Sequence, residues 1–214
     1  MRIAIVGCGE VGTTYARALL EAGGPDLVLV DPAPRAVLAD LAAEHHLSVH
    51  AGPGPWLHDV DAAWLCVAGD IVHEVLADAC GSLPEGVQVL DLTTASPDDK
   101  RRSAALLAGA GTYVDVVIMG AIAMGGAATP LLAAGPDAAA ATAELAAIGA
   151  PVQVLPEAGP GDAAALKLLR SILTKGIEAL GVDCLAAAEA LGVREELPVV
   201  LADIDAGGLT PFEI

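Results

Sequence analysis

The chain has 214 residues and a formal net charge of -18, from 28 acidic and 10 basic side chains. Hydrophobic residues make up 55% of it, which excludes a disordered chain because enough apolar surface is present to form a core. So acidic a chain repels phosphate backbones, and we expect no binding to nucleic acid. Its apolar runs are too short to cross a membrane, and we expect no membrane partner.

The beginning of the chain and its cysteines suggest a compartment. The first apolar run, Ile3–Val6, is too short for a signal peptide and leads straight into a turn. Four cysteines, Cys8, Cys66, Cys80 and Cys184, are scattered without a C-x-x-C pair. This usage is typical of buried thiols in a reducing environment, and we predict a cytoplasmic protein.

Short apolar runs alternate with helix-like segments over the first two thirds of the chain. This alternation predicts an α/β fold, a Rossmann-type doubly wound and mainly parallel sheet with helices on both faces. We predict strands at residues 3–6, 27–30, 62–67, 87–90 and 114–118, and helices at residues 11–22, 34–46 and 97–108. Ser96 is placed to cap the last of these helices.

The pattern changes near Gly159, and residues 162–191 show helical periodicity throughout. Apolar side chains recur there at steps of three and four, at Leu166, Leu169, Leu173, Ile177, Leu180 and Cys184. We therefore predict a dinucleotide-binding domain over residues 1–157, followed by a short all-α substrate or dimerisation region with one long helix over residues 158–214. An unpaired apolar helix face also predicts a homodimer.

The segment Gly7-Cys8-Gly9-Glu10-Val11-Gly12 has the pattern G-x-G-x-x-G of a dinucleotide-binding turn. It follows a predicted strand and opens a predicted helix, which is the context that the pattern requires. Gly7 permits the tight turn, Gly9 lets the backbone approach a pyrophosphate, and Gly12 allows the helix to pack on the strand. The N-terminus of that helix then faces the anion.

Asp31 directly follows the second predicted strand, 19 residues after Gly12. A carboxylate at this position can accept both ribose hydroxyls of NAD, and it repels the 2′-phosphate of NADP. Arg35 lies close enough in the sequence to weaken that preference. We expect NAD(H) in preference to NADP(H).

Residues 91–97, D-L-T-T-A-S-P, resemble the D-x-S-T-x-S-P loop of the β-hydroxyacid dehydrogenases. This family includes 6-phosphogluconate dehydrogenase and 3-hydroxyisobutyrate dehydrogenase, and its loop lies beside the nicotinamide. The resemblance implies that Thr94 contacts the cofactor or the substrate. The expected cofactor-binding residues are, in chain order, Gly7, Gly9, Glu10, Val11, Gly12, Asp31, Val67 and Thr94.

Residues 115–121, D-V-V-I-M-G-A, fall where the family has its substrate-binding segment D-A-P-V-S-G-G. Asp115 and Gly120 match, whereas Met119 replaces the serine that would hold a substrate carboxylate. The resemblance implies that Met119 and Gly120 contact the substrate. This replacement argues against an ordinary small 3-hydroxy acid.

Residues 159–161, G-P-G, followed by Lys167 resemble the third family motif, G-x-G-x-x-x-x-x-K-x-x-x-N. The resemblance implies that Lys167 is the catalytic lysine. Ser171 replaces the asparagine of the motif, and Arg170 could hold an anionic group of the substrate. We therefore include Arg170 and Ser171 among the substrate-binding residues.

The resemblance covers nearly the whole chain and implies an NAD(P)-dependent oxidoreductase. Its reaction would be hydride transfer between nicotinamide and a small, anionic hydroxy or keto acid, with Lys167 as acid and base. An imine reductase on the same fold, or a non-catalytic nucleotide-binding or sensor subunit, are the alternatives. The subgroup that it resembles has a poorly characterised helical C-terminal domain, which we expect to be incomplete here. We expect no metal site.

Overall fold

The computed structural model describes residues 1–206, with the side chains of residues 1–202. It divides into two compact units, residues 1–167 and the part from Leu168 onward. The boundary falls inside a long helix, and each unit is described by itself.

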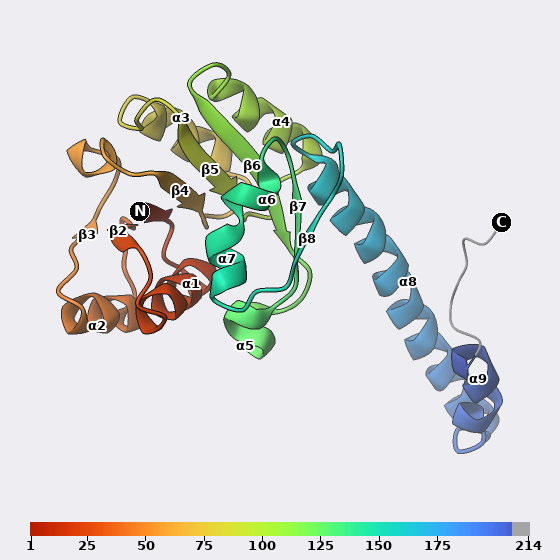
Figure 1. Cartoon of the computed structure of the whole chain (residues 1–214). Helices are drawn as coiled ribbons and strands as arrows, with labels where there is room; N and C mark the ends of the chain where they lie inside the picture. The colour runs from red at the N-terminus through yellow and green to blue at the C-terminus, as the bar shows by residue number, and fades with distance from the viewer. Residues whose placement is uncertain (207–214) are drawn as a thin grey trace. The chain divides into compact units, whose positions relative to one another are not determined.

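The elements are labelled in Figure 1. The first unit runs through β1 (Arg2–Val6), α1 (Glu10–Glu21), β2 (Asp26–Val30), α2 (Ala36–Glu44), β3 (Val49–His50), η1 (Pro55–Leu57), β4 (Ala62–Leu65), α3 (Val72–Cys80), β5 (Val87–Asp91), α4 (Pro97–Leu106), β6 (Gly111–Ile118), α5 (Ile122–Gly125), η2 (Gly126–Ala128), β7 (Leu131–Ala134), α6 (Ala138–Ala141), α7 (Ala143–Ala147) and β8 (Val152–Val154). It ends in the first turns of α8 (Asp162–Leu191), and α9 (Leu197–Ala206) follows in the second unit.

The strands form one eight-stranded sheet in the order β3-β2-β1-β4-β5-β6-β7-β8. All neighbouring strands are parallel except β6 and β7. The prediction of a Rossmann-type, mainly parallel sheet is therefore confirmed. The chain leaves β1 toward β2 and β3, then returns to β4 on the other side of β1. Ligands of such sheets bind where the strand order reverses, beyond the carboxyl ends of the strands.

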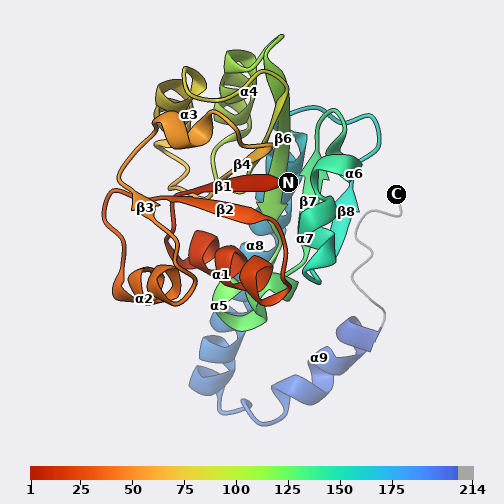
Figure 2. The ribbon, with the colours of Figure 1, turned by 60° about the vertical axis from the view of Figure 1, so that its left-hand side comes forward.

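Helices lie on both faces of the sheet (Figure 2). Its strands are apolar at successive positions, and these side chains are buried on both faces. One core contains Ile3 and Ile5 together with Tyr15 and Leu19 of α1, and it extends to α2, α5 and α7. The opposite core contains Ala4 and Val6 of the same strand, and it packs against α3 and α4. Alternate side chains of β1 thus enter opposite cores, as the period of two of a strand requires.

The predicted strands and helices are all present, with ends that differ by a few residues. The Ser96 hydroxyl accepts a hydrogen bond of 3.1 Å from the Asp99 amide, which confirms the predicted cap of α4. The helix over residues 162–191 is also confirmed. The structure adds the helices α3, α5, α6 and α7, the edge strands β3 and β8, and β7 between β6 and β8, none of which the sequence patterns predict. These strands have only two to four residues each, too few for a periodic pattern.

The described part of the second unit contains the remainder of α8 and the helix α9. Its apolar side chains are largely exposed within the chain, with 62% for Leu169, 72% for Ile172 and 65% for Leu180. Cys184 is exposed on the same helix, so the expectation of buried thiols is wrong for this residue, while Cys8 is buried and Cys66 and Cys80 are half-buried. Leu180 and Cys184 belong to the periodic apolar face that the sequence predicts, and within the described residues this face stays largely exposed.

Candidate functional site

The glycine turn lies at the point where the strand order reverses, between the ends of β1 and β4. The Gly7 amide donates to the Val30 carbonyl at 2.8 Å, and Gly7 has a φ of 85°, in the left-handed region. A Cβ atom on Gly7 would lie 2.6 Å from the Val67 side chain and 2.8 Å from its backbone nitrogen. Because Gly7 has no side chain, the turn packs directly against Val67 at the carboxyl edge of the sheet.

Gly9 and Gly12 serve different purposes in the same turn. A Cβ atom on Gly12 would lie 2.1 Å from the Gly7 carbonyl oxygen, so only glycine lets α1 pack this closely on the turn. A Cβ atom on Gly9 would have no neighbour within 4 Å. The space over Gly9 is open, beside the first residues of α1. Backbone amides at a helix N-terminus attract anions, and open space there admits a phosphate group.

Asp31 is bound to the glycine turn itself. One carboxylate oxygen accepts the Cys8 amide at 2.8 Å, and the other accepts the Ala33 amide, also at 2.8 Å. Each oxygen keeps a lone pair, because a carboxylate oxygen can accept two hydrogen bonds. Asp31 therefore stabilises the turn, and it retains capacity to accept a ribose hydroxyl beside it.

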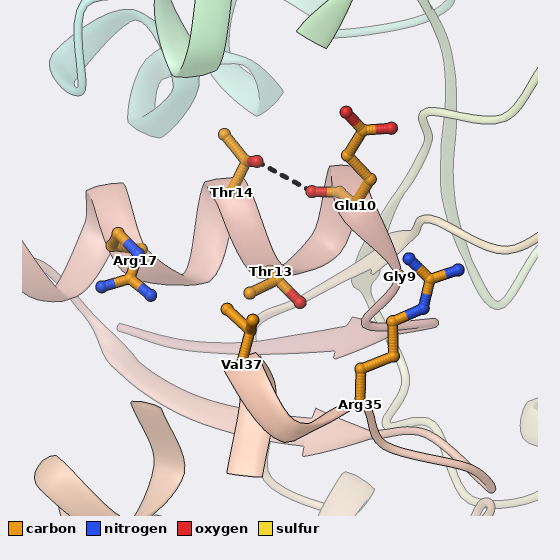
Figure 3. A pocket seen from close by; sticks show the side chains of 7 residues that line it. All are labelled: Gly9, Glu10, Thr13, Thr14, Arg17, Arg35 and Val37. Carbon is orange, nitrogen blue, oxygen red and sulfur yellow. Dashed lines mark hydrogen bonds between the residues drawn. The ribbon is translucent and has the colours of Figure 1, made fainter. Parts of the chain in front are cut away.

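Two arginines line a cavity of about 430 Å³ between α1 and α2 (Figure 3). Its lining residues are Gly9, Glu10, Thr13, Thr14, Arg17, Arg35 and Val37. Arg35 extends toward Gly9, whereas Arg17 lies farther along α1. The Thr13 hydroxyl donates to the Cys8 carbonyl at 2.7 Å and so ties the helix to the turn. The cavity offers positive charge beside the expected pyrophosphate position, and Arg35 is the nearer source of it.

A smaller and more apolar cavity, of about 150 Å³, lies against the other side of the turn. Among its lining residues are Gly7, Pro32, Val67, Ile71 and Val75. Apolar side chains from the ends of β2 and β4 thus meet at one place. A flat, weakly polar ring can be held between such groups.

The loop after β5 carries the two threonines of the second motif. Thr93 is buried, and its hydroxyl accepts the Ala95 amide, whereas Thr94 is exposed. The loop after β4 packs against it so closely that a Cβ atom on Gly69 would lie 2.6 Å from the Ala95 nitrogen. The structure therefore places the Thr94 loop beside the loop that follows Val67, at the carboxyl edge of the sheet. Of the two threonines, Thr94 is the one available to a ligand.

Lys100 was missed by the sequence analysis. It is fully buried, and its ammonium lies 2.9 Å from an Asp91 carboxylate oxygen and 3.1 Å from one of Asp115. The sequence around it, P-D-D-K-R-R, is typical of an exposed helix surface. Two signals in the sequence could have indicated that Lys100 is buried. Leu107 lies seven residues later, on the helix face that packs inward, and two aspartates on neighbouring strands would need a cation.

The third motif lies at the start of α8. Asp115 accepts the amides of Gly161 and Ala164 at 3.1 and 3.0 Å, so a β6 side chain caps this helix. Lys167 follows one turn later and is half-buried. Arg170 and Ser171 belong to the second unit. The structure thus joins the 115–121 segment to the third motif through Asp115.

Met119 and Gly120 follow β6 directly. Met119 packs against a small apolar cluster that includes Leu132 and Ala163, and it lines an open apolar cavity of about 490 Å³ with residues of β7, β8 and α8. Gly120 is exposed. Because no polar side chain replaces the missing serine at this position, a substrate carboxylate would need another partner.

The cysteines near the turn are held as thiols. Burial and the nearby Asp31 carboxylate raise the pKa of the Cys8 thiol to about 12. Burial also raises the pKa of the Cys66 thiol, with Cys8 and Asp91 adding to the effect. A raised pKa lowers the fraction of the nucleophilic thiolate, so these residues are poorly suited to covalent chemistry.

The described residues bear on two other classes of site. Within this part of the chain, no group of three or more histidine, cysteine, aspartate or glutamate side chains is arranged to hold a metal ion. None of the helices described there is long and apolar enough to span a membrane.

Residues 2–155 match the family model described as the NAD-binding domain of 6-phosphogluconate dehydrogenase. This match covers more than half of the chain, and the chain therefore belongs to that family of NAD(P)-binding domains. The resemblance to the β-hydroxyacid dehydrogenases is confirmed. Among curated proteins, no match is found.

Solved structures support the same fold. A conserved protein of unknown function, described as similar to 3-hydroxyacid dehydrogenases, is 26% identical, with a TM-score of 0.82 over 96% of this chain and 77% of its own. A 3-hydroxyisobutyrate dehydrogenase from Mycobacterium tuberculosis is 20% identical, with a TM-score of 0.83 over 94% and 70%. An imine reductase variant from Myxococcus stipitatus, in complex with NAD⁺, is 21% identical, with a TM-score of 0.78 over 98% and 74%.

Proposed function

We propose that this protein transfers a hydride between a nicotinamide cofactor and a small, anionic hydroxy or keto acid. The observation that carries the proposal is the glycine turn at the reversal of the strand order, with Val67 and the Thr94 loop at the same edge. In this proposal the amides at the start of α1 bind the pyrophosphate. Asp31 accepts ribose hydroxyls, and Thr94 lies toward the nicotinamide. The dinucleotide-binding domain covers residues 1–157, and the helical region from residue 158 serves substrate binding and dimerisation.

The reaction needs a proton donor as well as a hydride. When a carbonyl carbon accepts a hydride, its oxygen takes up negative charge and must receive a proton. We assign this role to Lys167, on the helix turn that Asp115 caps. Arg170 is proposed to hold an anionic group of the substrate, together with Ser171, because Met119 offers no hydrogen bond. Gly120 is proposed to contact the substrate, and Glu10, Val11 and the remaining cofactor residues keep the roles that the motifs imply.

Reduction of a C=N bond is the second candidate. Met119 favours it, since an apolar side chain replaces the serine that would bind a carboxylate. Solved imine reductases also share the fold with this chain. A cyclic or substituted imine binds through contacts with apolar side chains more than through a group that binds an anion.

Direct titration with the two reduced cofactors tests cofactor binding. We expect NADH to bind about tenfold more tightly than NADPH, which corresponds to about 1.4 kcal/mol, because the Asp31 carboxylate repels a 2′-phosphate. Nicotinamide fluorescence measures both affinities, and Arg35→Ala should weaken NADPH binding further because Arg35 is the nearer cation. Tighter binding of NADPH would show that Arg35 outweighs Asp31. Binding of neither cofactor would contradict the proposed function.

We further propose that a second copy of the chain covers the apolar side chains of α8. Supporting this, Ile172, Leu169 and Leu180 are more than half exposed within one chain, and such side chains are commonly covered in an assembly. Light scattering at micromolar concentration should give twice the 21.2 kDa of one chain. Ile172→Glu should shift the protein toward the monomer, whereas Thr174→Glu is the matched control. A monomeric parent protein would contradict the proposal.

A further inference from the structure

Asp91 and Asp115 are register partners at the end of two adjacent parallel strands. Both side chains are fully buried, and they lie on the face of the sheet that carries Tyr113. Two buried carboxylates side by side repel one another unless a cation lies between them. Lys100 supplies that cation from α4, in the helix layer that packs on this face of the sheet.

The Lys100 ammonium is held by both strands. It donates to the Asp91 backbone carbonyl at 2.8 Å and contacts a carboxylate oxygen of each aspartate. The Tyr113 hydroxyl donates to the other Asp91 oxygen. Burial and the Asp91 charge raise the pKa of Tyr113, so its hydroxyl keeps its proton. Lys100 thus neutralises part of the negative charge of the two aspartates, and the Tyr113 hydroxyl provides a hydrogen bond to the other Asp91 oxygen.

Each aspartate in turn holds a different segment of the candidate site. The Asp91 carboxylate accepts the Thr93 amide at 2.9 Å and so fixes the start of the Thr94 loop. Asp115 caps α8 through Gly161 and Ala164, one turn before Lys167. One cation therefore connects the loop on the nicotinamide side with the helix that carries the proposed acid.

The contact between α4 and α8 is close at the same place. Gly161 has a φ of 93°, and a Cβ atom there would lie 2.6 Å from the Pro97 carbonyl oxygen. Arg101, next to Lys100, also lies 3.4 Å from Asp162 at the start of α8. The N-terminal turn of α8 consequently packs against α4, and Lys100 lies under this contact.

We propose that Lys100 is a positioning residue, which holds the Thr94 loop and the Lys167 turn in one arrangement through Asp91 and Asp115. This inference rests on the proposed function, because it gives Lys167 a place beside the cofactor. Lys100 itself is fully buried, and its ammonium contacts Asp91 and Asp115. Its effect is transmitted by the two aspartates.

Hydrogen exchange on the NADH-loaded protein tests the connection. In Lys100→Met, amides of residues 93–96 and of residues 161–167 should exchange at least tenfold faster, because both aspartates lose their cation. Asp115→Ala leaves Lys100 and Asp91 as a balanced pair. It should accelerate exchange in residues 161–167 only, and it remains informative if Lys100→Met does not fold. Arg102→Met, two residues along α4 at an exposed ion pair, should change neither segment.

The extent of acetylation at each lysine provides a second measurement. It would not change if Lys100 only stabilised the fold. The chain has three lysines, Lys100, Lys167 and Lys175, and exposed Lys175 serves as the internal reference. Bound NADH should protect Lys167 in the parent protein and in Arg102→Met, and this protection should be lost in Lys100→Met and Asp115→Ala while NADH still binds.

The possible outcomes separate the two proposals. If NADH fails to protect Lys167 in the parent protein, Lys167 is not beside the cofactor and the proposed function loses its acid. If NADH protects Lys167 in the parent and equally in both cluster variants, the proposed function stands and the positioning role of Lys100 is overturned. Faster exchange in only one segment of Lys100→Met would likewise overturn the connection between them.

Discussion

Replacing Gly9 with alanine should abolish most NADH binding without unfolding the protein. A methyl group at this position meets no protein atom within 4 Å, so the free protein accommodates it. The same methyl group occupies the open space over the turn, where we place the pyrophosphate. Hydrogen bonds to charged groups contribute about 1.5–3 kcal/mol each, so the loss of one such contact should weaken NADH binding about 10- to 100-fold. Fluorescence titration measures the affinity, and thermal unfolding measures the stability.

Gly12→Ala is the contrasting control in the same turn. Its methyl group would lie 2.1 Å from the Gly7 carbonyl oxygen, so α1 must move away from the strand. Overpacking of this kind costs about 1–3 kcal/mol, and we expect lower stability together with weaker binding. If Gly9→Ala binds NADH as tightly as the parent protein, the pyrophosphate does not lie over the turn. An equal loss of stability in the two variants would also contradict this geometry.

The dinucleotide-binding half could be predicted because local patterns determine it. Ile3–Val6, the glycine turn and Asp31 follow one another within a short stretch, and each has its own sequence signal. The contact of Gly7 with Val67 was only partly accessible, because it joins residues 60 positions apart. Asp31 has a second role, to accept the Cys8 amide, which no sequence pattern shows.

The buried cluster around Lys100 could not be predicted from composition or periodicity. Its helix begins P-D-D-K-R-R, and a lysine in such a segment is usually exposed. What buries it is the register of β5 and β6, which places Asp91 opposite Asp115. That register is a tertiary property, because the two strands are separated by all of α4. The resemblance named Asp115 as a motif residue, whereas the structure identifies it as the cap of α8.

The region from Leu168 onward illustrates a different limit. Its helix bounds follow directly from the periodic sequence, and residues 162–191 are helical as predicted. The same periodicity predicts that the apolar face is buried, yet Leu180 and Cys184 are exposed within one chain. A pattern of apolar residues shows which face is to be covered, and it does not show by what.

Replacing Lys167 with alanine should abolish turnover and leave cofactor binding nearly unchanged. A general acid contributes about 10²- to 10⁴-fold to a rate, so the kcat of carbonyl reduction should fall by that factor. The affinity for NADH should stay within about twofold, because the turn, Asp31 and the Thr94 loop remain in place. The rate is followed as NADH oxidation, with the keto acid or imine that the parent protein reduces fastest in a substrate screen.

Lys175→Ala is the matched control for this experiment. Lys175 lies on the same helix, is exposed and pairs only weakly with Glu178 at 3.3 Å, so its removal should leave kcat within about twofold. If Lys167→Ala keeps the parent rate, the proton comes from another group and Lys167 has no catalytic role. If instead NADH binding falls as far as kcat, Lys167 contributes to holding the cofactor. The contrast between the two lysines thus separates proton transfer from a general loss of positive charge on the helix.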